Sequence, residues 1–183
     1  MVVLGVACVD SGPSDLATTF RETPFRSLPG VEMGMTAKRL HAVRPAAQFA
    51  PYLGMQEKIP GFAVSYQFPM ATAERATAEV RPEDTLEAVF ISQPFETMDQ
   101  AEAAWRERVR AVSSSHRAPT ICESVPGGGM QARWMSSKNV FAIGVFPQEK
   151  MAPVPNRVIY AFSLKDSMKQ PAGSTKMDCP NSP

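Results

Sequence analysis

The stretch TMDQAEAAWRERVRAVSS, residues 97–114, carries the strongest signal for local structure in the chain. Thr97 and the Gln100 three positions later form a capping box, which satisfies free N–H groups in the first turn of a helix. Apolar side chains then recur at helical spacing and so share one face. These are Met98, Ala101, Trp105, Val109 and Val112. The stretch predicts an amphipathic helix over residues 98–114 that packs against a sheet.

Apolar segments separated by turns surround this helix. Residues 130–135 and 140–146 flank the polar turn Ser136-Ser137-Lys138-Asn139, which predicts a β-hairpin. A further strand is expected over residues 157–164, and another over residues 86–92 precedes the helix. Strands that follow one another through short turns favour an antiparallel sheet.

A second arrangement of helix and strand lies earlier in the chain. Thr36 is a suitable N-cap for a short helix whose apolar face carries Leu40 and Val43. From residue 62 to residue 68, aromatic or branched side chains alternate with small or polar ones, the period of a strand with one buried face. The order of elements favours an α+β fold, an antiparallel β-sheet with helices packed on one face. Whether the core consists of two similar helix-plus-sheet halves stays open at this point.

Both ends of the chain differ in composition from its middle. Residues 9–24 and 166–183 are rich in Ser, Thr, Pro, Asp and Gly without periodicity, which predicts flexible segments. The chain has 183 residues, of which 44% are hydrophobic, enough for one core. We therefore expect a signal remnant and tether over residues 1–24, a single α+β domain over 25–165, and a flexible tail over 166–183.

The N-terminal stretch MVVLGVAC, residues 1–8, is uncharged and apolar, and a polar run follows it at once. This pattern resembles the end of a bacterial lipoprotein signal peptide, in which a Cys is acylated and becomes the new N-terminus. The resemblance implies that residues 1–7 are removed. It also implies that the lipid on Cys8 alone holds the protein at the membrane, in the periplasm or on the outer surface of the cell. The alternative is a frayed N-terminal strand with a buried Cys8.

Two further cysteines, Cys122 and Cys179, are available to form a disulfide in an oxidising compartment. Such a bond would tie the C-terminal segment to the domain. The alternative is a pair of free thiols, because the sequence does not give the Cα separation that a disulfide requires.

Motifs that carry chemistry are largely missing from the sequence. The two histidines, His41 and His116, have no metal-ligand spacing to a cysteine or a carboxylate pair, and no dinucleotide-binding glycine motif occurs, so we expect no metal and no cofactor. The net charge of +1, without a clustered basic segment, argues against nucleic-acid binding. One alternative is an enzyme or a small-ligand carrier whose site brings His116, Cys122 and Glu123 together.

The segment Met33-Gly34-Met35-Thr36, with the predicted helix after it, resembles the entry motif of the BamE (SmpA/OmlA) family of small bacterial envelope lipoproteins. The β-lactamase inhibitor protein has a related architecture. The resemblance covers residues 29–68. It implies a two-layer α+β fold, export, and a role in binding protein rather than in turning over substrate. Within the motif, Thr36 caps the helix and Gly34 permits a close approach of the chain to the sheet.

These features together predict a lipid-anchored, non-catalytic domain whose partner is an unidentified envelope protein. Aromatic side chains on the surface would mark the binding face, and the candidates are Tyr66, Phe68 and Trp134. Each of these three side chains has an alternative place in the core, because a strand buries one of its faces by default.

Overall fold

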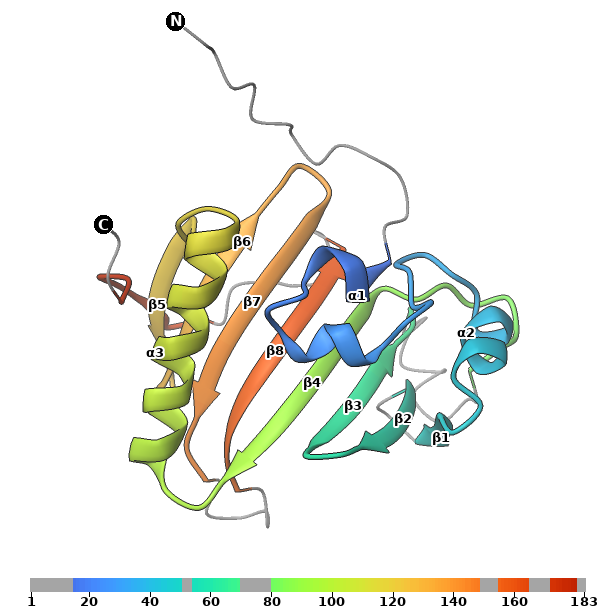
Figure 1. Cartoon of the computed structure of the whole chain (residues 1–183), viewed down its shortest axis with the longest axis horizontal. Helices are drawn as coiled ribbons and strands as arrows, with labels where there is room; N and C mark the ends of the chain where they lie inside the picture. The colour runs from blue at the N-terminus through green and yellow to red at the C-terminus, as the bar shows by residue number, and fades with distance from the viewer. Residues whose placement is uncertain (1–14, 51–53, 70–79, 149–154, 165–171, 181–183) are drawn as a thin grey trace, which may run out of the picture.

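The structure is a computed structural model, and it describes residues 15–50, 54–69, 80–148, 155–164 and 172–180. Within these ranges the chain has a mixed α+β fold built on one antiparallel sheet (Figure 1). The helices are α1 (Leu16–Thr19), the 3-10 helix η1 (Pro24–Ser27), α2 (Ala37–Val43) and α3 (Met98–Ser115). The strands are β1 (Gln48–Ala50), β2 (Gly54–Ile59), β3 (Phe62–Gln67), β4 (Ala88–Phe95), β5 (Ile121–Val125), β6 (Gly129–Met135), β7 (Asn139–Phe146), β8 (Asn156–Leu164) and β9 (Thr175–Met177).

The sheet has nine strands in the order β1-β2-β3-β4-β8-β7-β6-β5-β9. Strands β1 to β4 pair in sequence order and so do β5 to β8, which makes two meanders. The meanders join through β4 and β8, which pair from Ala88↔Ser163 to Phe95↔Asn156. α2 precedes the first meander and α3 precedes the second, so each meander of four strands follows one helix.

The predicted long helix is confirmed as α3, with both bonds of its capping box. The Gln100 N–H donates to Thr97 Oγ1 at 3.2 Å, and the Thr97 N–H donates to Gln100 Oε1 at 3.4 Å. The helix packs on β7, β8 and β4 (Figure 1). Its side chain Trp105 is fully buried, and the indole Nε1–H donates to the Ile143 carbonyl of β7 at 2.8 Å. Because this bond joins residues 38 positions apart, it fixes the helix on the sheet.

The other predicted elements are also present. The hairpin forms β6 and β7, the last predicted strand is β8, and the alternating aromatic segment is β3. The short helix is α2, and Thr36 Oγ1 accepts a hydrogen bond from the Arg39 N–H at 3.3 Å as an N-cap should. The strand expected over residues 86–92 begins instead at Ala88 and ends at Phe95.

The prediction that residues 9–24 form a flexible tether is wrong for the part that the structure describes, residues 15–24. Asp15 caps α1, and Leu16 is fully buried. The ring of Phe20 stacks on Phe141 of β7, with centroids 4.5 Å apart. These apolar residues follow no regular period because they contact the sheet from a four-residue helix and irregular chain. The described domain therefore includes residues before position 25.

The expectation of a flexible tail over residues 166–183 is wrong for the part that the structure describes, residues 172–180. This part contains β9, which pairs with β5 at the edge of the sheet. Residues 1–14, where the predicted signal remnant and Cys8 lie, are outside the described residues. Among the helices that the structure describes, none combines the length and the apolar character needed to cross a membrane.

Candidate functional site

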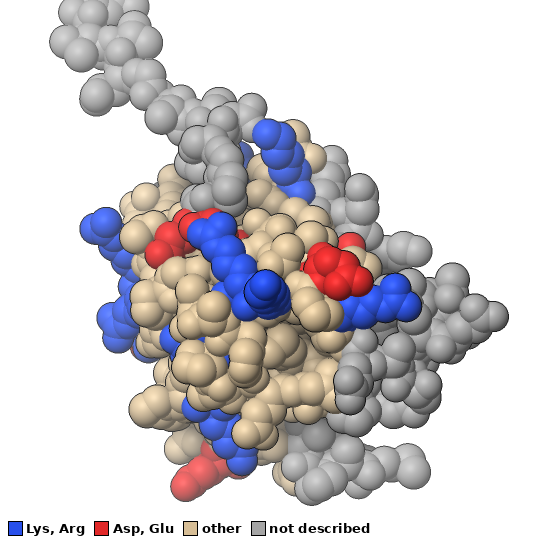
Figure 2. Space-filling model, turned by 90° about the vertical axis from the view of Figure 1, so that its right-hand side faces the viewer, with Lys and Arg blue, Asp and Glu red and all other residues tan. Residues whose placement is uncertain are grey.

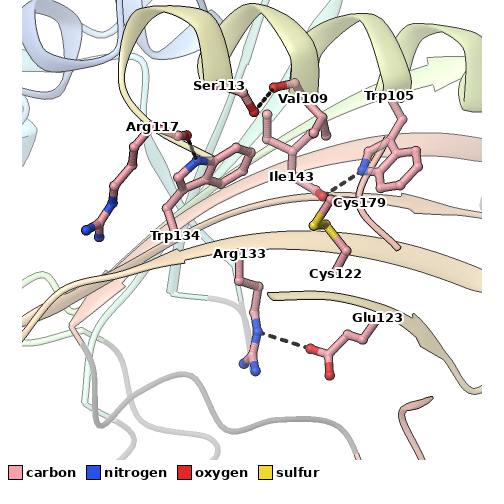
Figure 3. The surroundings of a disulfide bond; sticks show 10 residues. All are labelled: Trp105, Val109, Ser113, Arg117, Cys122, Glu123, Arg133, Trp134, Ile143 and Cys179. Carbon is pink, nitrogen blue, oxygen red and sulfur yellow. Dashed lines mark hydrogen bonds and ion pairs between the residues drawn. A yellow bond between two sulfur atoms is a disulfide. The ribbon is translucent and has the colours of Figure 1, made fainter. Parts of the chain in front are cut away.

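The edge of the sheet formed by β5 and β9 contains the disulfide between Cys122 and Cys179 (Figure 3). The sequence left open whether these two cysteines form a disulfide or remain free thiols, and in the structure they form the disulfide. The two Cα atoms lie 5.2 Å apart although the residues are 57 positions apart in the chain. Cys122 is buried in β5, and Cys179 packs partly buried against the same core. The bond therefore joins the C-terminal segment to the sheet.

Three polar side chains form a buried cluster beside the disulfide, on the other face of β5 and β6. Glu123, Gln131 and Arg133 have only 0%, 8% and 5% of their surface exposed. Gln131 Nε2 donates to Glu123 Oε1 at 2.7 Å. Arg133 Nε lies 3.0 Å from the same oxygen, as Figure 3 shows. Arg133 Nε makes no aligned hydrogen bond, so charge attraction joins this pair. Each of the two charges depends on the other, because an uncompensated buried charge is costly.

Sequence reasoning missed this cluster, although a signal for it exists. Gln131 and Arg133 occupy alternate positions of β6 and therefore share one face of the strand. Polar residues at alternate positions usually indicate a face turned to water. Here that face is buried. The register of β5 and β6 pairs Gln131 with Glu123 and Arg133 with Ile121, and this register brings the carboxylate of Glu123 close to the guanidinium of Arg133.

A second buried cluster lies near the opposite edge of the sheet. Glu57 of β2 accepts a hydrogen bond from Arg44 Nε at 2.8 Å and another from the Tyr66 hydroxyl of β3. Burial of Tyr66 raises the pKa of its phenol above the ordinary value of 10.0, and the hydrogen bond to Glu57 raises this pKa further. The cluster therefore ties the end of α2 to the sheet and keeps Tyr66 protonated.

The raised pKa of Tyr66 predicts a loss of stability in alkaline solution. The unfolded chain releases this proton near pH 10, whereas the folded chain retains it to higher pH. Above pH 10 the unfolded state then binds fewer protons, so the free energy of unfolding falls as the pH rises. Tyr66→Phe removes the group and should make the fall between pH 9 and pH 11.5 shallower in urea denaturation followed by circular dichroism.

Tyr160→Phe is the matched variant, since burial also raises the pKa of Tyr160. It should reduce the alkaline loss as well, and the double variant should reduce it more than either single one. Equal slopes for the wild type and all three variants would contradict the prediction. Comparison at pH 7, where both phenols are protonated, isolates the effect of losing the hydroxyl itself.

The proposed aromatic binding face is not on the surface. Tyr66, Phe68 and Trp134 are 0%, 7% and 6% exposed, so the alternative of core packing holds for all three. Trp134 contacts the ring of Phe141, with centroids 5.1 Å apart. All three side chains belong to the hydrophobic core of the domain.

The large apolar side chains that are exposed within the described ranges are Val43 and Phe49, at 39% and 41%. Val43 ends α2, and Phe49 is the central residue of the edge strand β1. Figure 2 shows the side of the molecule that carries α2 and β1, with Lys, Arg, Asp and Glu interspersed among uncharged residues. The coloured part of this face therefore presents charges of both signs.

The alternative catalytic cluster of His116, Cys122 and Glu123 does not assemble. Cys122 is bonded to Cys179 and has no free thiol. Glu123 points away from the disulfide, toward Arg133 (Figure 3). His116 caps the end of α3, where its Nε2 lies 3.5 Å from a carboxylate oxygen of Glu22. These three residues therefore provide no nucleophile with an adjacent base.

In the ranges that the structure covers, no three or more His, Cys, Asp or Glu side chains gather in a way that could hold a metal ion. Comparisons of the chain with known protein families, curated proteins and solved structures found no match. The function is therefore argued from the residues of this chain.

Proposed function

We propose that this chain is an exported, non-catalytic binding domain, held at the bacterial cell envelope by acylation of Cys8, with another envelope protein as its partner. The disulfide between Cys122 and Cys179 is the observation that carries the proposal. Disulfides persist in oxidising compartments and are rare in the cytosol. Of the three cysteines, the bond leaves Cys8 for the lipid, and Cys8 ends the apolar segment that resembles a lipoprotein signal.

The packing of the helices supports an arrangement with the helices on one face of the sheet. Phe20, just after α1, stacks on Phe141, and Trp105 of α3 donates to the carbonyl of Ile143. The side chains of Phe141 and Ile143 are two positions apart in β7 and so point to the same face, and both belong to one hydrophobic core with Phe20 and Trp105. This agrees with the architecture of the BamE family, which residues 29–68 resemble.

The pairing of the buried carboxylates with arginines of the same chain supports a binding role rather than a catalytic one. Within the described residues, the two buried carboxylates, Glu57 and Glu123, lie beside an arginine of this chain, at 2.8 Å and 3.0 Å. A catalytic acid or base must instead reach the proton of a substrate. These charges serve the packing of the domain, which suits a rigid scaffold that presents its surface to a partner.

The proposal is tested by the mass of the protein isolated from the membrane fraction of a bacterium that produces it. We expect a chain that begins at an acylated Cys8 and that gains the mass of two hydrogen atoms when its disulfide is reduced. The Cys8→Ser variant should retain residues 1–7 and leave the membrane fraction with its disulfide intact. An unprocessed cytosolic wild-type chain with its three cysteines free would overturn the proposal.

The binding role has its own test in the same cells. Chemical cross-linking of the acylated protein should give a discrete adduct with one envelope protein, identified by mass spectrometry. Cys8→Ser, which is no longer held at the membrane, serves as the control and should lose the adduct. If the wild type gives no adduct although it is acylated, the partner is absent and only the anchoring stands.

A further inference from the structure

β9 is a strand with few contacts of its own. It has three residues, lies at the edge of the sheet and pairs with β5 alone, from Cys122↔Met177 to Ser124↔Thr175. Thr175 and Lys176 are exposed, and only Met177 is partly buried. So short an edge strand buries little apolar surface to offset the entropy lost when its backbone is ordered.

The polar contacts of β9 are equally limited. Ser124 Oγ donates to the Thr175 carbonyl at 3.3 Å, and Lys176 stands opposite Glu123 in the register. The two side chains carry opposite charges, but Lys176 is exposed to water, which weakens their attraction. The covalent bond from Cys179, two residues after the strand, is therefore its strongest attachment to the sheet.

The rest of the sheet does not depend on β9. β5 remains paired with β6 from Ile121↔Arg133 to Val125↔Gly129. The most extensive contacts of α3 with the sheet are with β7, β8 and β4, none of which pairs with β9. The fold can therefore lose its last strand while the remaining strands stay paired.

From this arrangement we infer that the disulfide holds β9 on the sheet. Its reduction releases β9 and exposes the edge of β5, while the core of the domain stays folded. The release is a redox switch built into the fold. An open strand edge presents unpaired backbone N–H and C=O groups, which β9 covers in the oxidised protein. The inference does not rest on acylation of Cys8.

The reductant is a dithiol, and the exchange balances. One thiolate of the dithiol attacks the sulfur of Cys179, which is the less buried of the two cysteines, and Cys122 leaves as a thiolate that takes up a proton. The second thiol of the dithiol, once deprotonated, then displaces Cys179, which is protonated in turn. Two thiols form on the protein, and the dithiol becomes a disulfide.

The test is hydrogen exchange of the purified full-length chain, measured by mass spectrometry before and after reduction with dithiothreitol. We expect exchange in residues 175–177 to become at least about tenfold faster, with a smaller rise in residues 121–125. Exchange in residues 139–146 of β7 should change by less than about twofold. The Cys179→Ala variant should show the reduced pattern without any reductant.

Cys8→Ser is the control, because it keeps the disulfide between Cys122 and Cys179 and should respond to dithiothreitol as the wild type does. Two results would overturn the inference. Unchanged protection of residues 175–177 after reduction would mean that β9 stays in place without the bond. Equal loss of protection in β9 and β7 would mean that the bond supports the whole sheet. Either result leaves the membrane test of the proposed function unaffected.

Discussion

Replacing Trp105 with alanine is expected to lower the free energy of unfolding by about 3–5 kcal/mol, the range for removing a large buried aromatic side chain. Trp105 is fully buried where α3 meets the sheet. The change leaves a cavity at that contact and removes the hydrogen bond from its Nε1 to the Ile143 carbonyl. Urea denaturation followed by far-ultraviolet circular dichroism, which reports on the backbone rather than on tryptophan, measures the loss of free energy.

Two further variants separate the causes. Trp105→Phe keeps much of the apolar surface and removes the indole N–H, so it should cost less, about 1–2 kcal/mol. Arg110→Ala changes an exposed position of the same helix and should stay within about 0.5 kcal/mol of the wild type. A Trp105→Ala variant as stable as Arg110→Ala would show that α3 does not pack on β7 as described.

The second large effect is expected at the buried cluster of β5 and β6. Glu123→Leu should lower the free energy of unfolding by about 3–5 kcal/mol, because it leaves Arg133 as a buried charge without its counterion. Arg133 is only 5% exposed, so water can compensate little of this charge. Urea denaturation at pH 7 again gives the measurement.

The double variant Glu123→Leu/Arg133→Met tests that explanation directly. It replaces both charges with apolar side chains of similar size, and it should recover most of the stability lost in Glu123→Leu. The coupling energy from the complete cycle with Arg133→Met then isolates the interaction of the pair. Additive losses in the two single variants would contradict a coupled ion pair.

Elements with strong local signals were predictable from the sequence. α3 differs from the predicted helix over residues 98–114 by one residue at its end, because the capping box and the apolar stripe lie within the helix itself. The β6–β7 hairpin was predictable for the same reason, since the two apolar segments and the turn between them adjoin in the chain.

Elements without a local signal were missed or misread. α1 and η1 have four residues each, too few to show a helical period, and the segment is stabilised by contacts such as that of Phe20 with Phe141. β9 has only three residues, and its position depends on β5 and on the bond to Cys179. Flexible composition at both ends of the chain therefore did not predict flexible structure in residues 15–24 and 172–180.

In the candidate site, too, the sequence predicted residue types and strand faces but not the contacts between distant segments. The sequence named Cys122 and Cys179 as possible partners, but only the sheet topology brings their Cα atoms to 5.2 Å. Alternation placed Tyr66 on one face of a strand, but it could not say that this face is covered. The ion pair between Glu123 and Arg133 was not predicted, because it arises from the register of two strands.

By itself, the sequence determined the α+β class, the long helix, the central hairpin and the residues capable of forming a disulfide. The tertiary structure alone decided the order of the strands, which aromatic residues are buried, the pairing of the buried charges and the attachment of residues 15–24 and 172–180. The physical reason is distance along the chain. Helix caps and apolar periods act between residues a few positions apart, whereas burial and strand register depend on segments that meet only when the whole sheet forms.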